Sequence, residues 1–395
     1  MRLALLGFLI GCGSTGPVAP PDGSVPGGPL QMNDVSLMFP LAGPPSSYLA
    51  ASSSGSHGVL LPSEIYDSVG HLSGSTGNPA PGGTGEAKYD DLHVVAMRLD
   101  PCFATLAPDP HGTGCMNQLR LVFQQVTSVD GITTTFDSAL HAFYQLERQD
   151  LVDLANAIAS LRVENSSGER LGGLAPHPIM VSQGLDGTMA RSVRALVLRY
   201  AGKENLTRVT TFSSSNADFT WTFAGFDLDS AGAKTPMLIA SAPAGTTTQS
   251  FFRGFGSSIE GQFSPATIGP DDLTPLANAA SAAQLSATAR DAAWASLVRI
   301  DNPTRNSPNT IDCASCHLAT PIARLVGPTL SLDEATSTGA FAADGVHVLA
   351  SEMNPTFDAT AGFNLHAFSY SATDPAINQR TVNETAAIVE YLSAP

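Results

Sequence analysis

The stretch Cys313-Ala314-Ser315-Cys316-His317 constrains this chain of 395 residues more than any other feature. Two thiols three residues apart can add to the two vinyl groups of one haem, and the imidazole that follows directly can reach the iron. The spacing therefore predicts one covalently attached haem c. Cys313 and Cys316 would be its thioether anchors and His317 the proximal iron ligand.

Two other kinds of site also use a Cys-x-x-Cys pair, and they remain as alternatives. A zinc site needs two further ligands, and beyond the motif only the isolated His347 and His366 follow. A thioredoxin-like dithiol is expected where a helix opens after a strand. The segment just upstream, Asn306-Ser307-Pro308-Asn309, is typical of a loop. The sequence favours haem over both.

The N-terminus predicts export and a lipid anchor. Met1-Arg2 precedes the apolar run of residues 3–10, which is the layout of a bacterial export signal. Leu9-Ile10-Gly11-Cys12 resembles the bacterial lipobox, which implies that residues 1–11 are a signal peptide and that Cys12 becomes an acylated N-terminus. A buried N-terminal strand is the alternative. No later stretch approaches the roughly eighteen apolar residues of a membrane span, so we expect lipid attachment to a bacterial membrane, in the periplasm or at the cell surface.

The two remaining cysteines, Cys102 and Cys115, predict a disulfide. The loop between them is short and rich in Pro and Gly, and disulfides form in oxidising compartments outside the cytoplasm. Haem c assembly belongs in the same compartment. Two unpaired buried thiols are the alternative.

Charge limits the partners. The formal net charge is -16 at pH 7, which argues against nucleic acid or an anionic membrane surface as an electrostatic partner. A basic protein partner remains open.

Composition divides the chain into segments. Residues 12–85 predict a spacer because Gly, Pro, Ser and Thr dominate them, although apolar pieces such as 35–39 leave open that the spacer lies across the folded part. Residues 86–275 predict an α+β domain of unknown role. We expect strands over 93–99, 118–123, 206–212, 219–223 and 251–263. We expect helices over 138–144, 151–161 and 190–200.

No pattern in residues 86–275 indicates catalysis. His141 and His177 each lack a partner at ligand spacing, so we expect packed or surface histidines and not metal ligands. Trp221 and Phe223 alternate along one face of a strand, which is typical of a core.

The C-terminal section, residues 281–395, predicts a small, mostly α-helical haem domain. An apolar helix over 282–298 precedes the haem motif, and an amphipathic helix over 383–392 ends the chain. Together with residues 313–317 these resemble class I c-type cytochromes, in which a helix before the motif crosses a C-terminal helix beside the haem. The resemblance covers about the last quarter of the chain. It departs from that family in the dozen residues, with Pro303 and Pro308, that separate the first helix from Cys313.

The resemblance implies electron transfer with a redox partner protein, the iron cycling between its ferrous and ferric forms. Arg324 and Arg380 are candidate partners of the haem propionates, or else structural arginines. One alternative function is a peroxidase-like haem enzyme with an open iron site, although the bacterial di-haem peroxidases would bring a second Cys-x-x-Cys-His and this chain has one. Another is a surface binding or assembly module with an appended haem domain.

The sixth iron ligand stays open among three side chains. Methionine opposite histidine is usual in the class I family, which favours Met353 and the turn at Asn354-Pro355 that follows it. His366 lies nearer the terminal helix, as the distal ligand usually does in that family. His347 or an open site is the third possibility.

The lipid anchor is testable at Cys12. Because a single acyl chain gives only weak attachment, we expect two or more chains on a mature N-terminus that begins at Cys12. Mass spectrometry of the N-terminal peptide from membrane fractions measures this directly. An unmodified Cys12, or a mature chain that starts elsewhere, contradicts the prediction.

Overall fold

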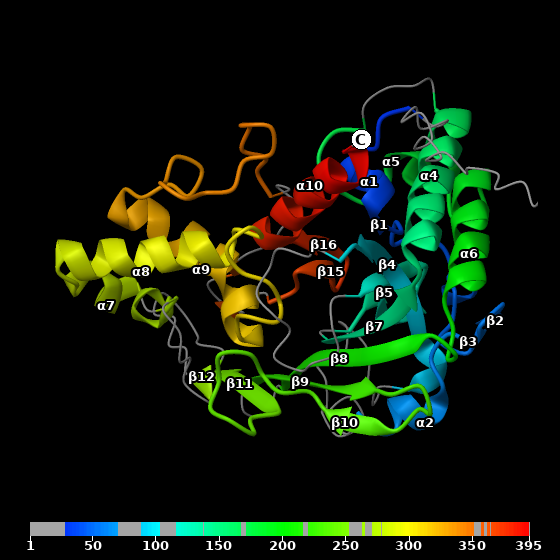
Figure 1. Ribbon diagram of the computed structural model, residues 1–395, viewed down its shortest axis with the longest axis horizontal. Helices are drawn as coiled ribbons and strands as arrows, with labels where there is room; N and C mark the ends of the chain where they lie inside the picture. Colours follow the sequence, from blue (N-terminus) through cyan, green and yellow to red (C-terminus); the bar gives the residue numbers. More distant parts are fainter. Residues whose placement is uncertain are drawn as a thin grey trace, which may run out of the picture.

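A large antiparallel sheet forms the centre of the molecule (Figure 1). The computed structural model describes residues 28–69, 88–102, 116–136, 138–166, 171–215, 220–252, 263–264, 271–277, 279–350, 357–358, 362–363 and 365–394. The sheet has ten strands in the order β1-β4-β5-β7-β8-β9-β11-β12, with β6 paired to β5 and β10 to β9. Their bounds are β1 Ser36–Met38, β4 Leu92–Asp100, β5 Asn117–Val129, β6 Ile132–Thr135, β7 Ser138–Leu146, β8 Leu206–Ser215, β9 Thr220–Leu228, β10 Lys234–Pro236, β11 Thr248–Phe252 and β12 Phe263–Ser264.

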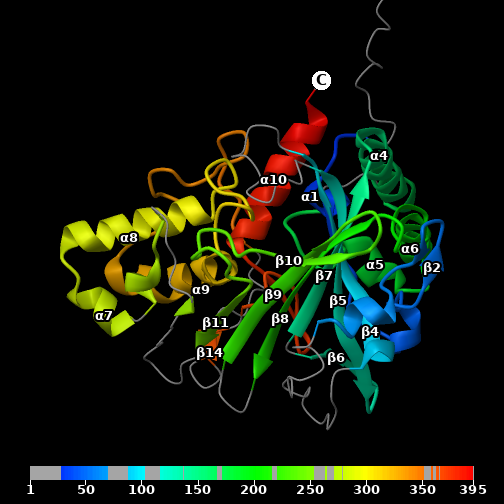
Figure 2. The same ribbon diagram turned by 60° about the horizontal axis from the view of Figure 1, so that its bottom comes forward.

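Helices cover the sheet on two sides (Figure 2). On one face lie α4 (Arg148–Asn165), α5 (Pro178–Gln183) and α6 (Thr188–Tyr200), with α4 in contact with β5 and β7. On the other side lie α9 (Cys313–Leu330), α10 (Gln379–Ser393) and the hairpin of β15 (Phe368–Ser371) and β16 (Asp374–Ile377). Behind α9 pack α7 (Ala279–Gln284) and α8 (Ala287–Ile300).

The smaller elements complete the described chain. They are α1 Met32–Val35, η1 Pro45–Ser47, β2 Ser54–Gly55, β3 Gly58–Val59, α2 Ser63–Tyr66, η2 Tyr89–Asp91, η3 Thr274–Leu276, β13 Phe357–Asp358 and β14 Gly362–Phe363. None of the helices in the described part of the chain combines the length and the apolarity that a membrane span requires.

The mixed α+β fold class is confirmed, and most predicted elements are present. The helix expected over 138–144 is wrong: these residues form β7, between β5 and β8. Leu140, Ala142 and Tyr144 point to the α4 and α6 side, while His141 and Phe143 point to the opposite side. A strand that is covered on both faces has a nearly continuous apolar run, which periodicity cannot separate from a buried helix. The helix expected over 282–298 is two helices, because Ser286 caps the start of α8.

Residues 28–69 are folded, so this part of the spacer expected over 12–85 lies across the folded part, as its apolar pieces had left open. Their apolar side chains are buried, and β1 forms the edge of the main sheet beside β4. The glycines here allow close packing: a Cβ on Gly55 would lie 1.7 Å from the carbonyl oxygen of Leu198 at the end of α6. Gly58 has a φ of +86°, which few residues other than glycine adopt. Glycine in this segment therefore serves a compact structure, not a flexible one.

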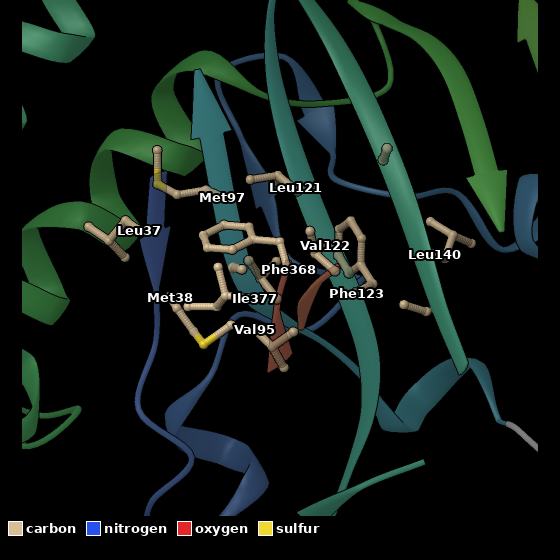
Figure 3. Packing of buried hydrophobic residues seen from close by; sticks show 14 of the residues in the cluster. Leu37, Met38, Val95, Met97, Leu121, Val122, Phe123, Leu140, Phe368 and Ile377 are labelled. Atoms are coloured by element: carbon tan, nitrogen blue, oxygen red, sulfur yellow. The ribbon is translucent and has the colours of Figure 1, made fainter. Parts of the chain in front are cut away.

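The C-terminal section shares its core with the sheet. Figure 3 shows Phe368 and Ile377 of the β15–β16 hairpin in the hydrophobic cluster beside β4 and β5. Polar bonds join the same parts: Gln124 Nε2 donates to the carbonyl oxygen of Tyr370 at 2.8 Å, and Gln124 Oε1 accepts from the Tyr370 amide at 2.8 Å. Residues 281–395 thus pack directly on the sheet, and a separate small cytochrome-like domain stays a prediction.

The hydrogen bonds of the Gln124 side chain should contribute measurably to the stability with which the β15–β16 hairpin is held on the sheet. We expect Gln124→Leu to lower the free energy of unfolding by about 2–4 kcal/mol, because it leaves the buried Tyr370 amide without a partner and the Tyr370 carbonyl oxygen with only the Thr135 hydroxyl, 3.3 Å away. Denaturant unfolding followed by circular dichroism measures it.

The matched control is Gln145→Leu, the same change at an exposed position of β7, which should stay within about 0.5 kcal/mol of wild type. Equal effects at the two positions would argue against the link.

Candidate haem site

The Cys-x-x-Cys-His stretch opens helix α9, and a buried polar network fixes its first turn. Asp312 is the N-cap, and its Oδ2 accepts from the Ser315 amide at 2.9 Å. Gln249 of β11 holds both ends of this turn: its Nε2 donates to Asp312 Oδ2 at 2.6 Å, and its Oε1 accepts from the Ala314 amide at 2.9 Å. One side chain of the sheet therefore sets where the motif begins.

Both cysteines of the motif are free thiols that border one internal cavity. Burial raises the pKa of Cys313 to about 12, and burial likewise raises the pKa of Cys316 to about 12. Thiols in such an environment stay protonated at neutral pH, whereas a redox dithiol or a metal-binding cysteine depends on its thiolate. The folded surroundings do not activate this pair.

His317 borders the same cavity, and one of its ring nitrogens has a fixed partner. Nδ1 lies 2.5 Å from the carbonyl oxygen of Leu365, so Nδ1 is the donor of this bond. Burial lowers the pKa of His317 to about 4, although the bond to Leu365 opposes this shift. The ring is neutral at pH 7, and its lone pair is on Nε2. A neutral imidazole whose other nitrogen donates to a carbonyl is the usual form of a metal-ligating histidine.

The sheet contributes the opposite wall of the cavity through two registered rows of residues. The first row runs across five neighbouring strands, from Arg98 through Arg120, Phe143 and Arg208 to Asp227. The second row contains Val122, His141 and Thr210. In both rows, members of adjacent strands lie directly opposite one another, so their side chains leave the sheet on the same face.

Aromatic rings surround the motif histidine. The ring of Phe212 lies 5.3 Å from that of His317, 4.9 Å from that of His366 and 6.3 Å from that of His141, measured between centroids. Phe223 lies 5.1 Å from His317. The thiols and imidazole thus face apolar surface on one side and the arginine row on the other.

Four arginines line the cavity, against two carboxylates, Asp312 and Glu384, among its described lining residues. Asp227 neutralises Arg208: Arg208 Nε donates to Asp227 Oδ1 at 2.5 Å, and Arg208 Nη2 donates to Asp227 Oδ2 at 3.2 Å. Arg98, Arg120 and Arg380 share only Asp100 and Glu384. Burial lowers the pKa of Arg120, and the charge of Arg98 lowers it further. On the sheet side of the cavity the described guanidinium groups outnumber the carboxylates by one, while Asp312 at the start of α9 supplies a carboxylate on the other side. An anionic group would therefore be favoured next to the sheet.

Glu384 of α10 holds this charge cluster together. Its carboxylate bonds Arg380 Nε at 2.7 Å and forms an ion pair with Arg98. Burial opposes the ionised form, but the guanidinium groups of Arg98, Arg380 and Arg120 prevail and lower the pKa of Glu384 to about 2. Arg380 also donates to the carbonyl oxygens of Ile300 and Asn306.

Several predicted site residues lie elsewhere or outside the described part. Arg380 lines the cavity, whereas Arg324 lies beyond it near the carbonyl oxygen of Ala350. His366 is buried behind the cavity, its Nδ1 2.6 Å from Ser369 Oγ, and His347 Nδ1 bonds the carbonyl oxygen of Phe341 at 3.0 Å. Cys102 is disulfide-bonded. The residues that lie outside the described ones are Cys12, Cys115 and Met353.

The arginines and His141 of the sheet were not recognised from the sequence. Arg98 stands between the buried Met97 and Leu99, and Arg120 between the buried Leu119 and Leu121. A charge among buried apolar residues of a strand needs a partner or a ligand. That signal was present in the sequence.

The described residues contain no group of three or more His, Cys, Asp or Glu side chains placed to hold a metal ion.

Comparisons with known proteins find no match among protein-family models, curated proteins or solved structures.

The ion pairs of Glu384 should contribute to stability in a way that depends on pH. Because its pKa falls from 4.5 to about 2 on folding, the contribution is complete above pH 4.5 and is lost as the pH falls toward 2. We expect Glu384→Gln to lower the free energy of unfolding by about 3 kcal/mol at pH 7 and by much less near pH 2. Denaturant titrations across this range measure the difference.

Glu164→Gln is the control, since Glu164 is an exposed glutamate of α4; it should have little effect at any pH. A Glu384→Gln effect that does not shrink in acid would contradict the assignment.

Proposed function

We propose that this chain binds one haem c covalently through Cys313 and Cys316, with His317 as proximal ligand, in the cavity between α9 and the sheet. The observation that carries this proposal is that both thiols and the imidazole of the motif border one cavity with aromatic walls and a cationic side. A zinc half-site or a dithiol does not require such walls. The resemblance to class I cytochromes in residues 313–317 points the same way.

The residues of the cavity match the parts of a haem. The two thiols would bond its vinyl groups, and the Leu365 carbonyl orients His317 so that Nε2 is its ligating nitrogen. Phe212 and Phe223 offer ring faces for the apolar part of the macrocycle. Two propionates carry negative charge, and the wall with Arg98 and Arg120 has an excess of positive charge to receive it.

The cavity is smaller than a whole porphyrin. Its volume is about 140 Å³, close to the roughly 150 Å³ that admits a benzene-sized guest. It is partly open, so one edge of the macrocycle would extend through the opening or the side chains at its rim would move apart. The donor set and the charge therefore support haem more strongly than the volume does.

Haem in this setting supplies one-electron redox chemistry, and the protein's part is to bury the iron and exchange electrons with a redox partner protein. We further propose export to the periplasm or cell surface with a lipid anchor at Cys12. The disulfide at Cys102 supports an oxidising compartment. The net charge of -16 suits a basic partner.

Covalent attachment is tested by expression with a c-type maturation system. We expect wild type to keep its haem-linked peroxidase stain through denaturing electrophoresis, and Cys313→Ala with Cys316→Ala to lose it, because the thioether bonds are then absent. Ser315→Ala is the matched control: it lies between the two cysteines and keeps the Ser315 amide that donates to Asp312. Haem that extracts into acidified organic solvent from wild type would overturn the proposal.

A further inference from the structure

His141 of β7 borders the same cavity as Cys313, Cys316 and His317, although it is 176 positions before His317 in the sequence. It stands in the second row of the sheet, between Val122 of β5 and Thr210 of β8. Neither neighbour in the row has a charged or strongly coordinating group. His141 is thus the one imidazole that the described sheet presents to the cavity from the side opposite α9.

The imidazole of His141 has no hydrogen-bond partner among the described residues; its closest ring contact is Phe212, at 6.3 Å. His141 is only partly buried and borders the cavity, so a group bound in the cavity can reach its ring. Burial lowers the pKa of His141 well below its ordinary value, and the charges of Arg120 and His317 add to this. The ring is therefore neutral at pH 7, which is the form that binds a metal.

The earlier candidate His366 lies on the wrong side of the proximal histidine. His317 Nδ1 points to the carbonyl oxygen of Leu365, and His366 follows Leu365 directly, so its backbone is on the Nδ1 side of that ring. A second axial ligand must approach the iron from the side to which Nε2 points. His366 is also absent from the described cavity lining.

Met237 is the other side chain of the cavity that could coordinate iron. Its thioether is satisfied by apolar surroundings and needs no ligand to explain its burial. His141 shares the ring of Phe212 as a neighbour with the motif histidine His317, so the geometry favours it over Met237.

We infer that His141 is the second axial ligand, so that the iron is held by one histidine from α9 and one from the central strand of the sheet. This inference rests on the proposed function. It gives residues 86–275 a role: they would supply one of the two protein ligands of the iron. Two histidines also set a lower reduction potential than a histidine and a methionine do.

The test uses the ferric holoprotein. We expect a low-spin spectrum without the long-wavelength sulfur-to-iron charge-transfer band. His141→Ala should convert the iron to a high-spin, open form that binds cyanide rapidly, while its haem stays covalently attached on denaturing gels. His141→Met should restore a low-spin iron and gain the sulfur band, which a merely structural role for His141 would not produce. His366→Ala and Met237→Ala are the controls and should leave the spectrum unchanged.

Each other outcome overturns a defined part. If wild type has the sulfur band and Met237→Ala or Met353→Ala loses it, that methionine is the second axial ligand. If His141→Ala stays low-spin and His366→Ala makes the iron high-spin, the second axial ligand is His366. A wild type that is already high-spin makes the site open and removes the distal role of His141. Absence of covalent haem in wild type overturns the proposed function itself, and this inference with it.

Discussion

The carboxylate of Glu384 is the group on which the arrangement of the cavity depends. It belongs to the last helix, yet it binds Arg98 from the second strand of the main sheet and Arg380 from its own helix. Burying three guanidinium groups would be prohibitive without it and Asp100. The cluster therefore fixes α10 over β4, and α10 in turn lies against α9, which begins with the motif. The two carboxylates leave one of three positive charges without an ion-pair partner on the sheet side, while Asp312 lies on the α9 side of the cavity.

The cavity is composite, and the two halves contribute different chemistry. The helical side contributes the thiols and the imidazole with a fixed hydrogen bond. The sheet contributes the arginine row, His141 and the aromatic rings, each placed by strand register. Because register sets every second residue of a strand on one face, a single slip of β7 would turn His141 and Phe143 away and bring Ala142 and Tyr144 inward. The site is therefore as specific as the sheet pairing itself.

The sequence predicted the parts of the site that are local and missed those that are not. Residues 313–317 are adjacent in the chain, so their spacing alone specifies the motif. His141 and Arg98 were not recognised because a ligand role depends on neighbours from distant strands, and a single sequence does not reveal strand order. Composition left open whether the segment 28–69 lies across the folded part, because it cannot distinguish a glycine that gives flexibility from Gly55, which permits contact with α6. The helix expected over 138–144 failed because β7 is covered on both faces.

The same composite arrangement changes what the resemblance to class I cytochromes means for this chain. A self-contained cytochrome domain buries its own core, whereas residues 281–395 bury Phe368, Tyr370 and Glu384 against strands from the first half of the chain. Separated from the sheet, this section would expose those side chains and leave the Tyr370 backbone without Gln124, at about 1–3 kcal/mol for each unsatisfied group. Contacts between residues more than two hundred positions apart also make the site late in folding, since loop closure must come first. The cavity is thus a property of the whole fold, and the motif is the one part of it that a short segment can specify.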